Sequence, residues 1–98
     1  MSVYLINSYD IVDAKVFQDY PPKVLSILKK YGAKVLASDT TATALEGIPK
    51  TMNAIIEFPS EETVWSCYND PDYVEAKKIR LLSTTNCTMV IVKQFDSN

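Results

Sequence analysis

The last apolar run of the chain, residues 88–95, presents large apolar side chains on both faces of the strand that it predicts. Met89 and Ile91 have one parity, and Val90 and Val92 have the other. Successive side chains of a strand point to opposite faces of a sheet. Antiparallel sheets usually keep one face polar, because water covers that face. A chain with this pattern must therefore cover both faces of its sheet with apolar material.

The remaining elements follow from periodicity and from the turn residues between them. Strands are predicted at 3–9, 33–38, 51–58 and 88–95, with a short extra strand at 43–46, and helices at 13–31, 60–69 and 72–82. Pro21 and Pro22 interrupt the first helix, so we expect a kink or a short turn near Tyr20 and a fresh helix at the prolines. Gly32 is a good stop for that helix.

The order strand–helix–strand–strand–helix–strand is that of the split βαβ, or ferredoxin-like, arrangement. We therefore predict an α+β fold, βαββαβ with an antiparallel sheet, and one domain covering residues 1–98. Two helices can cover one face of this sheet. For the other face we expect a second copy of the chain, because twofold pairing is the commonest solution. The alternative is a monomer with a hairpin or tail folded over the sheet.

Composition excludes several classes of function. The net charge is −2 and no Lys/Arg run stands out, so nucleic acid is not an expected partner. No apolar run approaches 18 residues, so no membrane span is expected. Cys67 and Cys87 have no disulfide or metal-ligand pattern, which favours free thiols in a reducing cytoplasm. The chain has no histidine, the usual general base, haem ligand and zinc ligand, so we expect no metal or other cofactor.

The stretch Tyr68-Asn69-Asp70-Pro71-Asp72-Tyr73 breaks a helical segment and restarts it. Asp70 can cap the new helix, as Asp13 and Ser60 can cap the earlier ones, and Pro71 suits its first position. We place Asp70, Tyr68 and Tyr73 among the candidate ligand-binding residues. A tyrosine suits a pocket wall because its body is apolar and its tip is polar. The simpler interpretation is that both tyrosines belong to the core.

Arg80 lies two helical turns after Tyr73, on the same face of the helix. It is a candidate to hold a substrate carboxylate or enolate in a bidentate fork. Equally, it is a candidate to pair with Glu57, with Asp10 or with an acid of the other subunit.

Three further polar residues lie in strands or at their ends. Glu57 and Asp10 are candidate bases, Glu57 if it faces the cleft, where burial would raise the pKa of its carboxyl. A solvated or salt-bridged side chain is the simpler interpretation of each. Asn7 is a candidate to orient a ligand carbonyl, the alternative being a hydrogen bond to the backbone. We interpret Cys67 as a small buried hydrophobe.

The chain resembles the family known as domain of unknown function 1330, in the dimeric α/β-barrel superfamily. The resemblance covers nearly the whole chain and lies in four runs: Lys30-Tyr31-Gly32-Ala33-Lys34-Val35-Leu36, Leu45-Glu46-Gly47, Ile56-Glu57-Phe58-Pro59-Ser60, and Tyr68 to Tyr73 followed by Arg80. It implies a ferredoxin-like subunit, a homodimer with face-to-face sheets, and a cleft between sheet and helices. The wider superfamily includes cofactor-free monooxygenases, isomerases and haem enzymes, along with members of no known activity. Where the family usually has tryptophan before the tyrosine of this motif, this chain has Cys67, and its one tryptophan is Trp65.

Two hypotheses follow for the function. In the first, a homodimer binds a small, partly apolar organic molecule in that cleft and acts on it as a cofactor-free monooxygenase or isomerase does. A carboxylate, Glu57 or Asp10, would then deprotonate or orient the substrate, while Tyr68, Tyr73 or Arg80 stabilises negative charge. In the second, the domain is a non-catalytic dimerisation or interaction module. No constellation in the sequence dictates a reaction, so the sequence leaves open whether the chain is an enzyme.

Overall fold

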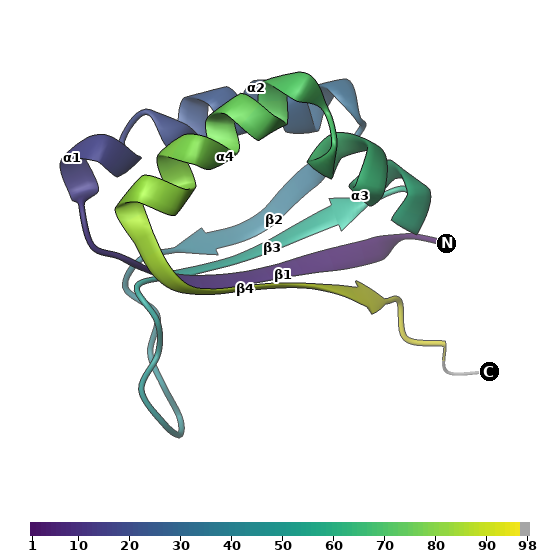
Figure 1. Cartoon of the computed structure of the whole chain (residues 1–98). Coiled ribbons are helices and arrows are strands. Elements are labelled where there is room, and N and C mark those ends of the chain that lie inside the picture. The colour runs from purple at the N-terminus through teal and green to yellow at the C-terminus, as the bar shows by residue number, and fades with distance from the viewer. Residues whose placement is uncertain (97–98) are drawn as a thin grey trace.

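Helices cover one side of a four-stranded sheet in the computed structural model, which describes residues 1–96 (Figure 1). Residues 97 and 98 of the predicted domain lie outside the described part. The strands are β1 (Val3–Ile11), β2 (Lys34–Asp39), β3 (Met52–Phe58) and β4 (Thr84–Lys93). The helices are α1 (Ala14–Phe17), α2 (Tyr20–Lys30), α3 (Glu61–Tyr68) and α4 (Pro71–Ser83).

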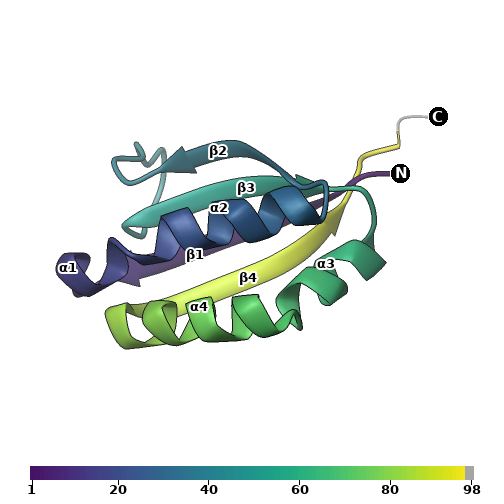
Figure 2. The same ribbon diagram turned by 90° about the horizontal axis from the view of Figure 1, so that it is seen from above.

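The strand order is β2-β3-β1-β4, and every neighbouring pair is antiparallel. The two terminal strands thus lie side by side, and the β2–β3 hairpin completes the sheet. This is the ferredoxin-like arrangement, so the α+β fold predicted from the order of elements is confirmed. Seen from above, α2 and α4 run next to each other along the sheet, with α3 at one end of α4 (Figure 2).

The predicted helix starts are confirmed. Asp13, Ser60 and Asp70 each accept a hydrogen bond from a backbone N–H of the first turn that follows. Such a side chain takes one of the donors that a helix leaves without a partner at its N-terminus.

Prolines and a glycine set the limits of α2. The first helix predicted from the sequence is in fact two helices, α1 and α2. Helix α2 begins at Tyr20, with Pro21 and Pro22 in its first turn, where a backbone N–H would have no partner within the helix in any case. The helix ends before Gly32, whose φ of +67° is a backbone conformation that favours glycine.

Two boundaries differ from the sequence-based prediction. The short strand expected at 43–46 is wrong: residues 40–51 form a loop, which projects from the sheet on the side away from the helices (Figure 1). A strand needs a neighbour to take its backbone hydrogen bonds, and these residues lie beyond the sheet. The last strand begins at Thr84 rather than 88, because Thr84 and Thr85 pair with the end of β1 past an irregularity in register.

The sheet is apolar on both faces, as predicted. The face under the helices carries the buried side chains of the core, among them Val3, Tyr9, Met52, Ile56 and Phe58. The other side, which we call the open face, carries Tyr4, Ile6, Ile55, Val90 and Val92, which the strand register places next to one another. Of these, Ile55, Val90 and Val92 are 38%, 51% and 45% exposed.

Candidate functional site

A cavity of about 220 Å³ lies between the sheet and the helices. We call it the pocket. Its floor is formed by side chains of β1, β3 and β4, among them Leu5, Asn7, Ile56, Met89 and Ile91. Its roof is formed by side chains of α2, α3 and α4, among them Tyr20, Leu28, Val64, Trp65, Tyr68 and Tyr73. These lining residues carry no formal charge, so the pocket offers an apolar wall with a few polar tips.

Asn7 is a polar residue in the floor of the pocket, and it is only 8% exposed. Its Oδ1 atom is buried and has no hydrogen-bond partner within residues 1–96. The backbone bond expected as its simpler role is therefore not made by this oxygen. Buried polar atoms without partners are rare and costly, so this oxygen needs a partner that the described chain does not supply.

Tyr73 and Tyr20 meet at the pocket, and their hydroxyl oxygens are 3.0 Å apart. Both side chains are buried. Burial and the neighbouring Tyr73 raise the pKa of the Tyr20 hydroxyl, so this group stays protonated. The two hydroxyls of the pair are thus joined by one hydrogen bond. Tyr73 lines the pocket and also belongs to the hydrophobic core. It is therefore a pocket-wall residue and a core residue at once.

Arg80 interacts with both tyrosines of this pair, is 3% exposed and is outside the pocket lining. Its Nη1 donates to Cys87 Sγ at 3.0 Å, while Nε has no partner in residues 1–96. Burial lowers the pKa of the guanidinium, but Tyr73, Tyr20 and Cys87 raise it by more, so the cation persists. The ion pair expected with Glu57 or Asp10 is wrong, since neither acid bridges to Arg80.

Tyr68 stands at the side of the pocket, with the Trp65 ring edge-on to it at 6.2 Å between centroids. Its hydroxyl accepts a hydrogen bond from Lys77 Nζ at 2.6 Å, and the same ammonium lies 4.4 Å from the ring centroid. The hydroxyl is thus engaged by a surface cation, and the ring is left to form the wall.

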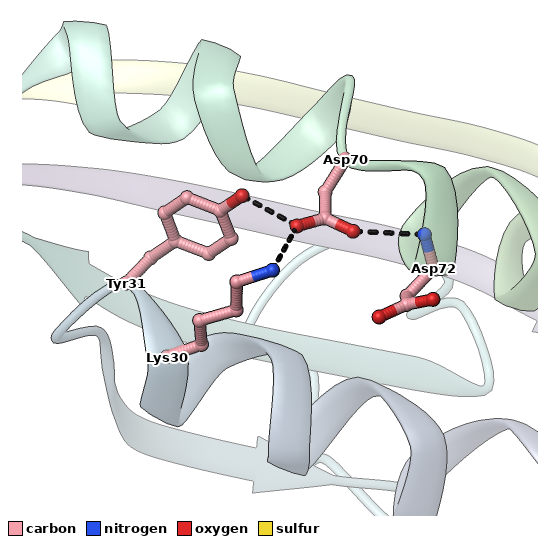
Figure 3. Close-up of polar contacts among 4 residues, drawn as sticks. All are labelled: Lys30, Tyr31, Asp70 and Asp72. Carbon is pink, nitrogen blue, oxygen red and sulfur yellow. Dashed lines mark hydrogen bonds and ion pairs between the residues drawn. The ribbon is translucent and has the colours of Figure 1, made fainter.

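Asp70 is buried and lies outside the pocket lining. Its carboxylate accepts from Lys30 Nζ at 2.8 Å, from the Tyr31 hydroxyl at 2.5 Å and from the backbone N–H of Asp72 at 2.8 Å (Figure 3). The hydrogen bonds from Lys30 and Tyr31 lower the pKa of this carboxyl to about 2. Asp70 therefore ties the end of α2 to the α3–α4 junction, a role that leaves little capacity for a ligand.

Two candidate bases are placed away from the pocket. Glu57 has the parity of Ile55, so it lies on the open face, opposite Tyr4 and Lys34 in the strand register. Asp10 accepts from the Thr51 backbone N–H at 3.1 Å and from Asn86 Nδ2 at 3.2 Å, and the latter bond is the largest cause of its lowered pKa. Through these two hydrogen bonds Asp10 links the end of β1 to the start of β3 and to β4.

The remaining reactive groups are few. Cys67 and Cys87 are not joined in a disulfide. Cys67 is buried in the pocket wall, and burial, followed by the charge of Asp70, raises the pKa of its thiol to about 11. Within residues 1–96, no three His, Cys, Asp or Glu side chains gather as a metal site would require. No helix in that range has the length and apolar character that crossing a membrane demands.

Sequence reasoning missed three contributors. From the sequence, Tyr20 marks only the break in the first helix, although its hydroxyl is the partner of Tyr73. Lys30 and Tyr31 lie about forty residues before Asp70, and no local spacing connects them to it. The one signal in the sequence is the presence of Tyr20 and Tyr31 in the predicted helix 13–31, because a buried tyrosine hydroxyl needs a partner.

Replacing Tyr20 by phenylalanine is expected to destabilise the fold by about 1–2 kcal/mol, because the buried Tyr73 hydroxyl then loses its hydrogen bond to Tyr20. Thermal or urea unfolding measures this loss. Tyr68→Phe is the matched control, since its hydroxyl is held only by a partly exposed lysine, and we expect less than about 0.5 kcal/mol. Equal losses of stability in the two variants would show that the buried Tyr20–Tyr73 hydrogen bond contributes no more to stability than the bond between Lys77 and Tyr68 does.

The chain was compared with known protein families and solved structures. A family model described as a domain of unknown function (DUF1330) matches residues 2–95. A protein of unknown function from Rhodopseudomonas palustris has 18% identity and a TM-score of 0.83; the alignment covers 97% of this chain and 83% of that one. Among curated proteins, none matches the chain.

Two further solved structures share the fold at lower identity. A dimeric protein of unknown function with a ferredoxin-like fold, from Bacteroides fragilis, is 15% identical with a TM-score of 0.68, covering 95% of this chain and 96% of that one. A protein from Nitrosomonas europaea, proposed as an antibiotic biosynthesis monooxygenase, is 11% identical with a TM-score of 0.67, covering 98% and 100%. At such identities these likenesses establish the fold alone.

Proposed function

The chain belongs to the DUF1330 family, whose description names no activity, and we propose that it binds a small, mainly apolar organic molecule in the pocket. The observation that carries the proposal is the pocket itself: about 220 Å³ with uncharged walls and a buried, unpartnered amide oxygen at Asn7. An engineered apolar cavity of roughly 150 Å³ stays free of water and binds benzene. A cavity of this size and lining therefore suits a molecule of one or two rings.

Binding ranks above catalysis because of what lines the pocket. Glu57 and Asp10, the expected carboxylate bases, are outside the lining, and so is every other acid of residues 1–96. A monooxygenase or isomerase mechanism that begins with deprotonation by a carboxylate of the same subunit has no group to perform it here. The Tyr20–Tyr73 pair supplies polar groups to the roof but no base, and the Arg80 cation that interacts with it lies outside the lining.

We also propose that the chain forms a homodimer through the open face, with the two sheets facing each other as in a dimeric α/β barrel. Apolar side chains of that face are exposed in the single chain, namely Ile55, Val90 and Val92. Monomers rarely expose a contiguous apolar patch of this kind. The loop 40–51 projects on the same side and carries Leu45 and Ile48, which are 100% and 97% exposed. The Bacteroides fragilis relative is dimeric, which supports the proposal.

Indane, a neutral molecule of two fused rings, is expected to bind saturably, because it fits the size and polarity of the pocket. Two-dimensional ¹H–¹⁵N NMR during a titration measures this binding through the amides of β1, α3 and β4 that flank the pocket. Met89→Trp is the blocking variant, since it places a larger ring in the pocket floor, and it should lose the saturable shifts. Shifts that never saturate, or that cluster on the open face, would count against a pocket for small molecules.

A further inference from the structure

The amide of Asn7 is the one feature of the pocket with an unmet chemical requirement. Its side chain sits at mid-strand in β1, with Ala54 and Met89 opposite it on the two neighbouring strands. The pocket and a second cavity of about 330 Å³, on the other side of α2, both reach this residue. A buried carbonyl oxygen at such a place accepts a hydrogen bond when a donor enters beside it.

Apolar residues would fill this position at lower cost. The neighbours of Asn7 on the helix-facing side include Leu5, Ile56 and Met89, and a leucine in its place would leave no polar atom unpartnered. An unpartnered buried polar group lowers stability. Such local violations of otherwise consistent packing are expected where a residue serves binding rather than folding.

The charge of the pocket restricts the ligand further. No Lys, Arg, Asp or Glu side chain is in the lining: Arg80 interacts electrostatically with Tyr20 and Tyr73 from outside it, and Lys77 is engaged by the Tyr68 hydroxyl. An ionised ligand would leave water without a compensating charge, which is strongly unfavourable. The ligand class is therefore neutral.

From these observations we infer that the pocket selects neutral, mainly apolar molecules that carry a hydroxyl group, and that this hydroxyl donates its hydrogen bond to Asn7 Oδ1. The inference rests on the proposed function, because it names the class of molecule that the same pocket takes. It also assigns a direction to the recognition: the protein accepts and the ligand donates.

Isothermal titration calorimetry with four related probes tests this assignment. Indane provides the apolar body alone, 1-indanol adds a hydroxyl, 1-indanone adds an acceptor without a donor, and indane-1-carboxylate adds a charge. We expect 1-indanol to bind about tenfold more tightly than indane, which corresponds to about 1.4 kcal/mol. We expect 1-indanone to gain clearly less over indane than 1-indanol does, and the carboxylate to bind more weakly than indane.

Asn7→Leu is the decisive variant. It should lose the preference for 1-indanol, so that 1-indanol and indane bind to it with about the same affinity. It should also melt at a higher temperature, because the unpartnered oxygen is gone. Asn53→Leu, a change in β3 outside the pocket lining, is the control and should keep the preference.

The outcomes separate this inference from the proposed function. If indane binds but 1-indanol and indane bind equally, or if 1-indanone gains as much as 1-indanol, the pocket stands and the inference is overturned. A preference for 1-indanol that survives in Asn7→Leu overturns it too. If none of the four probes binds the natural chain, the proposed function itself fails.

Discussion

Replacing Val92 by lysine is expected to convert the proposed dimer into monomers. Val92 lies on the open face opposite Tyr4 and is 45% exposed in the single chain. In a twofold dimer each substitution occurs twice, so two charges would be buried at once. With about 2 kcal/mol for each charge forced into the apolar interface, the dimer Kd should rise roughly a thousandfold.

Sedimentation velocity over a range of protein concentrations measures this change. Val74→Lys is the matched control: it is also a valine, is 44% exposed and lies on α4, in the helical layer. The control should sediment as the natural chain does. If the natural chain itself sediments as an 11.0 kDa particle at micromolar concentration, the open face is not covered by a second copy.

Replacing Asp70 by alanine is expected to lower the Tm by about 10 °C. Loss of a helix cap alone costs roughly 1 kcal/mol, which corresponds to about 4–8 °C for a domain of this size. The substitution also removes the acceptor shared by Lys30 and Tyr31, which ties α2 to α4. Asp13→Ala is the control, because it removes the exposed cap of the four-residue helix α1 and should cost clearly less.

The Asp70 carboxylate should also make the stability of the fold depend on pH in the acid range. Its pKa in the fold is about 2, below the value of about 3.9 that it takes in an unfolded chain. A lowered pKa contributes stability that is full above pH 4 and is lost as the pH falls toward 2. In Asp70→Asn, which keeps the size and capping ability of the side chain, the decline in Tm between pH 4 and pH 2 should be smaller. An unchanged decline would mean that other carboxyls cause it.

Local signals predicted the fold because they act within a few residues. Asp13, Ser60 and Asp70 cap helices through neighbours two or three positions away, and prolines and glycines mark element ends. The predictions that failed depend instead on contacts between residues far apart in the sequence. The strand expected at 43–46 depends on a partner strand that the chain does not place beside it, and the early start of β4 depends on pairing with distant residues of β1.

The candidate site was predicted only in part for the same reason. Tyr68, Tyr73 and Asn7 line the pocket as expected, whereas their role in binding a ligand stays a prediction. The parity of β3 already separated Glu57 from Phe58, but only the structure shows that the Phe58 side lies under the helices. Arg80 shares a face with Tyr73 as expected, yet its partner is a cysteine thiol rather than an acid.

A crystal structure of the natural chain soaked with 1-indanol tests the central claim most directly. Our account predicts electron density for the two rings between the sheet and the helices, with the hydroxyl at about 2.7–3.0 Å from Asn7 Oδ1. Side chains closed over an empty cavity, with that oxygen bonded to the protein's own backbone, would contradict it.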